Sequence, residues 1–331
     1  MSDLQLTRRN FVGVAAVGAV TAAAGLAGCS SGTASSSSSS EDKPAGETSA
    51  ENQSEQASAS ADKTMEEEMA KPVILVTSFG TSFPDSRHIT IGAIEGDIRE
   101  AFPNYDVRRA FTAQIIIDHI ESDTGRHIDN FEEAMDKIVA AGVKELIVQP
   151  THLMDGFEYT DIKESLENYK DKFEKCALGA PLLTTKDDQV AVAHALKEAM
   201  KKYEDDSTAI CLMGHGTEAA SNTIYATMQQ VFDDLGYKNY FIATVEAEPT
   251  FEDACKAAQA AGYKRAVLRP LMVVAGDHAN NDMADADDPE SFASILTAAG
   301  FEVESVIEGL GQLVAIDEIY VKHVQDAINS L

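Results

Sequence analysis

The chain has few basic residues and few cysteines. Its 26 lysines and arginines stand against 55 aspartates and glutamates, and the formal net charge is −29. A chain this acidic lacks the basic surface that binds nucleic acid or an anionic membrane. The cysteines beyond Cys29 have no CxxC spacing, which argues against a zinc knuckle and a disulfide framework. We expect no disulfide bond, with Cys211 and Cys255 in the core.

A long apolar run is also missing. Residues 12–26 are apolar but too short, and too rich in alanine and glycine, for a strong membrane span of roughly 20 residues. They follow a twin-arginine motif, Arg8-Arg9, and end in Leu-Ala-Gly before Cys29, which is typical of a bacterial lipobox. Residues 1–29 therefore predict export and lipid attachment at Cys29, on the outer side of the cell membrane. The alternative is an uncleaved membrane anchor.

Composition divides the rest of the chain. Residues 30–70 are a serine-rich, low-complexity stretch that cannot bury a core, and we predict a disordered tether. The remaining residues suit two similar lobes better than one domain. We assign residues 71–200 to an N-terminal lobe and residues 201–331 to a C-terminal lobe.

The folded part repeats itself. Residues 131–156 match residues 251–276 without a gap, with the same glycine and proline positions. Residues 73–82 resemble residues 208–217. This spacing indicates two copies of one βαβ-rich lobe.

Both copies have the same predicted elements. Strands alternate with amphipathic helices, which predicts the α/β class with parallel sheets; the strand order cannot be read. In the first copy we expect strands at 72–78, 106–111 and 145–148 and helices at 89–102 and 130–141. In the second copy we expect strands at 208–213, 240–245 and 265–274 and helices at 220–235 and 250–261.

Two histidines follow apolar runs that are typical of buried strands. His215 comes after residues 209–212 and His278 after residues 271–274, each beside glycine. Ligands of open α/β sheets bind beyond the carboxyl ends of the strands, and glycine leaves room for a large flat ligand. Imidazole is a usual ligand of borderline divalent metals, so we predict one metal site. The alternative is that each histidine only caps a strand or bonds a loop carbonyl.

Three carboxylates complete this prediction. Glu246 stands where the strand at 240–245 meets its loop, and it is our candidate for a third metal ligand. The alternative is that Glu246 only caps the following helix. Asp277 and Asp282 are predicted to organise the His278 loop as hydrogen-bond acceptors.

The repeat assigns different chemistry to the two copies. The first copy has Phe79 at the position of His215 and Glu158 at the position of His278. We therefore expect the C-terminal lobe to hold the metal and the N-terminal lobe to supply apolar surface and a carboxylate. His152 enters the same loop as Glu158, and for it a cleft role and a structural role stay open.

Five segments resemble a known family, the anaerobic cobalt chelatases, also called sirohydrochlorin cobaltochelatases. The resemblance runs from about residue 71 to the C-terminus, and its most specific stretch is 276–284. It implies two chelatase-type α/β lobes with a cleft between them and insertion of Co²⁺ into sirohydrochlorin, without ATP, in cobalamin biosynthesis. The export signal departs from most relatives, which are cytoplasmic. The segments are residues 78–82, 109–112, 213–216, 270–284 and 309–311.

The resemblance also implies roles for individual residues. By motif, the metal ligands fall on His215, Glu246 and His278, and Glu158 matches a further cleft carboxylate. We expect His215, alone or with Glu246, to accept a proton as the metal moves, and Glu158 to take the other proton or to orient the ring. For binding the ring and its carboxylates, our candidates are Ser78, Gly80, Thr81, Ser82, Arg109 and His152.

A second function uses the same residues. An exported chelatase fold could carry haem, another tetrapyrrole or a metal ion without turnover. The expected partner is thus a tetrapyrrole, with membrane contact only through the lipid. The sequence leaves open the metal used in the cell, haem binding and whether the chain forms a homo-oligomer.

Overall fold

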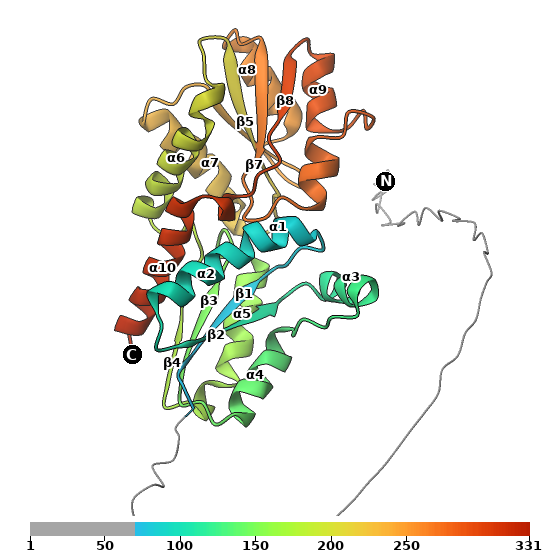
Figure 1. The fold of residues 1–331 in the computed structure, drawn as a ribbon. Helices are drawn as coiled ribbons and strands as arrows, with labels where there is room; N and C mark the ends of the chain where they lie inside the picture. Colours follow the sequence, from blue (N-terminus) through green and yellow to red (C-terminus); the bar gives the residue numbers. More distant parts are fainter. Residues whose placement is uncertain (1–69) are drawn as a thin grey trace, which may run out of the picture. The chain divides into compact units, whose positions relative to one another are not determined.

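The computed structural model of the protein describes residues 70–331 (Figure 1). The predictions of a twin-arginine signal, a lipobox at Cys29 and a serine-rich tether fall on residues 1–69 and lie outside the described part. Among the described helices, none is both long enough and apolar enough to cross a membrane.

The described residues form two four-stranded parallel sheets, which confirms the predicted α/β class. The N-terminal sheet has the order β2-β1-β3-β4 and the C-terminal sheet the order β6-β5-β7-β8. The strands are β1 (Val73–Ser78), β2 (Asp106–Phe111), β3 (Glu145–Pro150), β4 (Lys175–Leu178), β5 (Thr208–Gly214), β6 (Tyr240–Thr244), β7 (Arg265–Pro270) and β8 (Glu302–Ser305).

Helices cover both faces of each sheet, as Figure 1 shows. Short 3-10 turns and one π-helical turn at Ala279–Met283 connect some of them. The α-helices are α1 (Pro84–Ile89), α2 (Ile91–Ala101), α3 (Gln114–Thr124), α4 (Phe131–Ala140), α5 (Phe157–Glu167), α6 (Lys186–Met200), α7 (Thr223–Asp234), α8 (Phe251–Ala260), α9 (Phe292–Ala298) and α10 (Val314–Asn329).

The central strands explain the two helical layers. All six residues of β1 are buried, and successive side chains point to opposite faces of the sheet. Ile74 and Val76 join a core cluster with α2, whereas Val73 and Leu75 join a second cluster with α4 and α5. Apolar residues at every position of a strand therefore predict a sheet covered on both sides.

The repeat is confirmed in the register of the two sheets. Thr77 on β1 pairs with Pro150, and Met213 on β5 pairs with Pro270, so these positions correspond. The repeated Phe-Glu-x-Ala motif starts α4 and α8, and each helix has a capping box, from Asn130 and from Thr250. Two copies of one lobe follow directly.

Several details differ from the sequence prediction, which did not include the helices α3, α5, α6, α9 and α10. Each lobe has a fourth, edge strand, β4 or β8, that the pattern did not predict, because four residues at a half-exposed edge carry little periodicity. The strand predicted at 265–274 ends at Pro270, and residues 271–274 form bends. The first helix of the N-terminal lobe is broken at Thr90 into α1 and α2.

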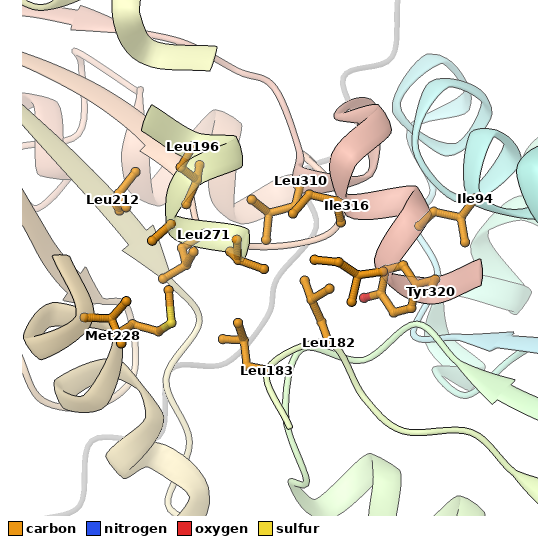
Figure 2. Packing of buried hydrophobic residues seen from close by; sticks show 14 of the residues in the cluster. Ile94, Leu182, Leu183, Leu196, Leu212, Met228, Leu271, Leu310, Ile316 and Tyr320 are labelled. Atoms are coloured by element: carbon orange, nitrogen blue, oxygen red, sulfur yellow. The ribbon is translucent and has the colours of Figure 1, made fainter. Parts of the chain in front are cut away.

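Each lobe is completed by a helix from the other half of the chain. Helix α6 packs on α7, and its Leu196 lies beside Leu212 and Leu271 of the C-terminal lobe. Helix α10 packs on α2 and β3, with Tyr320 beside Leu182 and Ile94 of the N-terminal lobe (Figure 2). One apolar cluster thus runs through both lobes and holds them as one unit.

Candidate functional site

The loops at the carboxyl ends of the two sheets meet where the lobes join. The backbone N–H of Ala275 donates a hydrogen bond to Ser86 Oγ at 3.1 Å. A Cβ atom on Gly276 would lie 2.9 Å from Thr81 Oγ1. The turn after β1 therefore packs tightly against the loop that carries His278, and glycine is required there for the close approach.

His215 and His278 lie together at this junction. Their rings are edge to face, with centroids 4.6 Å apart and planes at 89°. Both side chains are partly accessible, at 43% for His215 and 29% for His278. The two histidines are far apart in the sequence, but each follows a strand of the same parallel sheet. Because these strands end at the same edge, the sheet brings the two side chains together.

Hydrogen bonds fix which ring nitrogen of each histidine is available. His215 Nδ1 lies 2.8 Å from the carbonyl oxygen of Gly216, and His278 Nδ1 lies 2.8 Å from Asp282 Oδ2. Because both partners are acceptors, Nδ1 is the donor in each bond, and Nε2 is the ring nitrogen that remains for another partner. A metal ligand needs this arrangement, and a carboxylate behind one imidazole is a common partner in metal sites.

Glu246 completes the predicted group. Its Oε2 lies 3.6 Å from His215 Nδ1, and its side chain is 57% exposed. The backbone N–H of Glu246 donates to the His215 carbonyl at 2.9 Å, which ties the two loops together. The alternative role as a helix cap does not apply, because Thr250 caps α8 with Asp253. Two imidazoles and one carboxylate are therefore neighbours, but among the described residues their ligand atoms do not all lie within 4.8 Å of one another, and metal binding stays a prediction.

The two aspartates organise the His278 loop as predicted. Asp277 Oδ1 accepts from the Asn281 amide at 2.8 Å, and Asp282 holds the His278 ring. The bond to Asp282 raises the pKa of His278, against the effect of burial, and the charges of Asp277 and Glu246 act in the same direction. The surroundings of His278 favour positive charge, and an incoming cation would experience the same field.

The N-terminal lobe faces this group with different residues. Glu158 stands in the first turn of α5, and its Oε2 lies 3.8 Å from a Cβ built on Gly156; Ser221 Oγ, from the C-terminal lobe, lies 3.7 Å from the same point. Phe79 and Phe157 are 46% and 57% exposed, which is unusual for large apolar side chains. The predicted carboxylate and apolar surface are thus both at the lobe junction.

The turn predicted to bind the ring's carboxylates is largely occupied by internal contacts. Ser78 is buried and its hydroxyl accepts a hydrogen bond from Thr151 at 2.7 Å. Gly80 adopts φ 102° against the ring of Phe111, and Thr81 is buried. Ser82 is the most accessible of the four candidates. Their role in substrate binding stays a prediction, and the six-residue helix α1 is too short to add a strong dipole.

Arg109 already has an acidic partner. Its guanidinium makes two bonds to Glu95, of 2.5 and 2.7 Å. Arg87 instead donates to the carbonyls of Thr81 and Ser82, at 2.8 and 3.4 Å, and no carboxylate within residues 70–331 pairs with it. Burial, with the nearby Arg109 and Arg126, lowers its pKa. Of these arginines, Arg87 is the one next to the lobe junction without a paired acid.

His152 does not join the two metal-site histidines in any observed contact. Both of its ring nitrogens are buried without a hydrogen-bond partner among the described residues, and burial lowers its pKa to about 4. Its imidazole is therefore neutral. Its backbone carbonyl accepts from Leu182, which ties the loop after β3 to the loop before α6.

A second cluster of ligand-type residues is held by its own contacts. His127 lies 2.8 Å from Glu121 and 2.9 Å from Glu133, and Asp129 is 3.8 Å away. Lys137 already neutralises Asp129 at 2.5 Å. His127 is exposed and the two acids are partly exposed, so the cluster forms a surface network of ion pairs.

One residue of the site was not found from the sequence. Tyr225, on α7, is 1% exposed, and its hydroxyl accepts from the Gly216 N–H at 3.2 Å. The ring fills the space where Gly214 lacks a side chain. In the sequence, only the two glycines beside His215 indicated a residue packed closely against this turn. They do not identify that residue as Tyr225.

A hollow of about 240 Å³ lies between helix α1 and the loop that carries His278. Asn280, two residues after His278, is part of its wall, and neither histidine lines it. The rest of the wall comes from Phe83, Pro84, Asp85, Ser86, Ile89, Ala275, Ile307 and Gln312.

Comparison with known proteins adds a family. The sequence model described as cobalt chelatase (CbiK) matches residues 72–329. The chain is 32% identical over 259 residues to a sirohydrochlorin cobaltochelatase of Salmonella typhimurium, covering 78% of this chain and 97% of that protein. It is 29% identical over 265 residues to the sirohydrochlorin cobaltochelatase CbiKC of Nitratidesulfovibrio vulgaris, covering 80% and 93%.

Solved structures agree on the fold. SirB from Bacillus subtilis, solved with Fe³⁺, superimposes with a TM-score of 0.54 at 14% identity, covering 78% of this chain and 97% of SirB. At this identity, the likeness concerns the arrangement of the two lobes.

Proposed function

The chain belongs to the cobalt chelatase (CbiK) family, and on this premise we propose that it is a sirohydrochlorin cobaltochelatase. It inserts Co²⁺ into sirohydrochlorin without ATP. The observation that carries this proposal is the pair of neighbouring imidazoles next to Glu246, with each Nδ1 held by an acceptor and each Nε2 without a hydrogen bond within residues 70–331. This group offers two nitrogens and one carboxylate oxygen to the metal substrate and leaves coordination positions for the ring nitrogens.

The reaction exchanges one Co²⁺ for two protons of the ring. As the macrocycle nitrogens replace the protein ligands, two pyrrole N–H bonds break and their protons need acceptors. His215 and Glu246 stand on the metal side and receive one proton as the ion leaves them. Glu158, in the N-terminal lobe, stands at the other side of the junction and receives the second.

The N-terminal lobe also provides the contact for a flat ring. Phe79 and Phe157 expose about half of their surface at the positions that correspond to His215 and Asp277. Aromatic side chains stack on conjugated rings and gain from excluding water. The macrocycle would lie against these rings with one face toward the imidazoles.

Turnover with the purified protein tests the proposal. Sirohydrochlorin and Co²⁺ are mixed with and without enzyme, and the absorption of the metallated ring is followed. We expect a rate well above the uncatalysed one. Stoichiometric binding of the ring without faster metallation would contradict the proposal and favour a carrier of tetrapyrrole or metal, the reading that the export signal favours.

We also propose that the protein is exported through the twin-arginine route and anchored through lipid on Cys29. The support is Arg8-Arg9, the short apolar run and the lipobox. Cells grown with a labelled fatty acid should yield labelled wild-type protein and unlabelled Cys29→Ala precursor. Equal labelling of the two would sink this proposal.

A further inference from the structure

Tyr225 lies directly beneath the turn that carries His215. A Cβ atom on Gly214 would be 2.1 Å from the Tyr225 ring, so the ring fills the space below the end of β5. Its hydroxyl lies 3.2 Å from the Gly216 nitrogen and accepts that N–H. The residues on both sides of His215 are therefore set by one side chain from α7.

The imidazole of His215 takes its orientation from the same glycine. His215 Nδ1 donates to the Gly216 carbonyl at 2.8 Å, and Gly216 adopts φ 86°. Few residues tolerate this φ, so the turn has little stability of its own and needs an external support. Two contacts therefore link Tyr225 to the imidazole: the Tyr225 hydroxyl accepts from the Gly216 N–H, and the Gly216 carbonyl accepts from His215 Nδ1.

We propose that Tyr225 is a positioning residue of the metal site, which aims His215 Nε2 at the ion through the Gly216 backbone. This inference rests on the proposed function only in taking His215 as a metal ligand. Outer partners that orient a metal-binding histidine are commonly worth 10- to 100-fold in metal affinity or activity.

The surroundings keep the Tyr225 phenol neutral. Burial raises its pKa, the backbone N–H groups of Gly216 and His215 lower it, and the charge of Glu158 raises it again. The hydroxyl therefore keeps its proton while it accepts from the backbone.

A second side chain supports the same turn one residue further along. Asn222 Oδ1 accepts from the Thr217 N–H at 3.0 Å, and its amide donates to the Glu248 carbonyl at 2.8 Å. Asn222 thus holds the Gly216–Thr217 peptide, whose carbonyl accepts from His215 Nδ1, whereas Tyr225 holds the preceding His215–Gly216 peptide. The two side chains support the turn from both sides, and the proposal predicts an effect on Co²⁺ binding from each.

The test uses Tyr225→Phe, which keeps the ring against Gly214 and removes only the hydroxyl. Purified protein is titrated with Co²⁺ alone, and the visible absorption of the bound ion reports its coordination. We expect about tenfold weaker binding and an altered spectrum. The rate of ring metallation should fall by a similar factor with KM for sirohydrochlorin unchanged, and Asn222→Ala, which frees the next peptide of the same turn, should change the Co²⁺ affinity and this rate in the same direction.

Tyr240→Phe is the matched control. Tyr240 is also buried in the C-terminal lobe, but it starts β6 at the far end of the sheet, where its hydroxyl bonds Glu204 at 2.6 Å. Losing that hydroxyl should lower the urea midpoint of unfolding about as much as Tyr225→Phe does, with wild-type Co²⁺ binding and spectrum.

The outcomes separate this inference from the proposed function. If wild type binds Co²⁺ but does not metallate the ring, the titration and the spectrum still decide the role of Tyr225. Wild-type affinity and spectrum in Tyr225→Phe would overturn the inference, and so would equal changes in Tyr240→Phe. Failure of the wild-type protein to bind Co²⁺ at all would overturn it together with the metal site.

Discussion

The N-terminal and C-terminal sheets have the same strand order and the same register, yet only the C-terminal sheet ends in the two histidines that we propose as metal ligands. Phe79 and His215 occupy corresponding positions after the first strand, followed by glycines with φ of 102° and 86°. Glu158 and His278 correspond after the third strand. One backbone thus presents an apolar ring and an acid from one lobe, and two imidazoles from the other.

The contacts between the lobes follow the same pseudo-symmetry. The Thr81 hydroxyl of the N-terminal lobe packs against Gly276 of the C-terminal lobe. The Ser221 hydroxyl of the C-terminal lobe packs against Gly156 of the N-terminal lobe. Each lobe therefore docks its third-strand loop onto the first turn of the other. The lesson is that the fold fixes where four side chains meet, and the identity of those side chains decides what they do.

The largest expected effect comes from giving the C-terminal lobe the residues of its counterpart. His215→Phe removes one imidazole, and we expect loss of Co²⁺ insertion by more than about 100-fold, since even an outer partner of a ligand is worth 10- to 100-fold. His278→Glu keeps an oxygen ligand and should lose less than His278→Ala. Thermal unfolding should change little, because both side chains are partly exposed.

Initial rates of ring metallation and Co²⁺ titrations of these three variants check this prediction. If His215→Phe and His278→Ala both bind and insert Co²⁺ like wild type, the two lobes do not differ in metal binding and the site lies elsewhere.

The next effect comes from the acid of the N-terminal lobe. Glu158→Gln keeps the size of the side chain and removes its capacity to take a proton. We expect turnover to fall by about 100-fold, within the usual range for general base catalysis, with Co²⁺ affinity within twofold of wild type. The comparison fails if Glu158→Gln weakens Co²⁺ binding as much as it slows turnover, because the acid would then belong to the metal side.

The sequence predicted that the histidines lie in the C-terminal lobe and that the acid and the apolar surface lie in the N-terminal lobe. It did not predict the residues that hold these side chains in place. Identical spacing of glycine and proline showed the repeat, and the strand-end positions of His215 and His278 placed both at one edge. Tyr225 was not predictable, because its contact with Gly216 depends on how α7 packs under β5. Arg109 was assigned to substrate, because sequence does not show that Glu95 on α2 pairs with it.

The sequence pattern also did not predict that α6 packs on the C-terminal lobe and α10 on the N-terminal lobe. Neither α6 nor α10 is among the helices predicted from the sequence, and nothing local in the sequence says which sheet each helix covers. The buried contacts of Leu196 and Tyr320 decide it in three dimensions.

The paired glycines give a smaller and more selective effect. A Cβ on Gly216 would lie 2.8 Å from the Ala247 nitrogen, and one on Gly80 would lie 2.6 Å from the Phe111 ring, both at positive φ. Gly216→Ala and Gly80→Ala should therefore each lower the free energy of unfolding by about 1–3 kcal/mol. Only Gly216→Ala should also alter the spectrum of bound Co²⁺. Urea unfolding measures the stability of both variants, and Co²⁺ titration measures the spectrum of the bound ion. Equal spectral changes in Gly216→Ala and Gly80→Ala would contradict the proposed difference between the lobes.

The last comparison is between the two exchanged helices, each of which buries an aspartate in its first turn. Asp188 on α6 is 3% exposed and caps its own helix through Thr185, with His323 at 3.3 Å. Asp317 on α10 is equally buried, but its Oδ1 has no partner among the described residues. Burial, with the charge of Asp97, raises the pKa of Asp317 to about 8.

This difference predicts opposite responses to amide substitution. Between about pH 4 and pH 8 the unfolded chain releases the proton of Asp317 while the folded protein keeps it, so stability falls as the pH rises, by at most about 1.4 kcal/mol per unit. Below pH 4 both states hold the proton, and the penalty is absent. Asp317→Asn should remove this slope and be more stable than wild type at pH 8, whereas Asp188→Asn should destabilise, because it breaks the cap and the pair with His323. Urea unfolding at pH 5, 6.5 and 8 measures both variants, and an unchanged pH slope in Asp317→Asn would show that the folded protein already ionises this carboxyl at neutral pH.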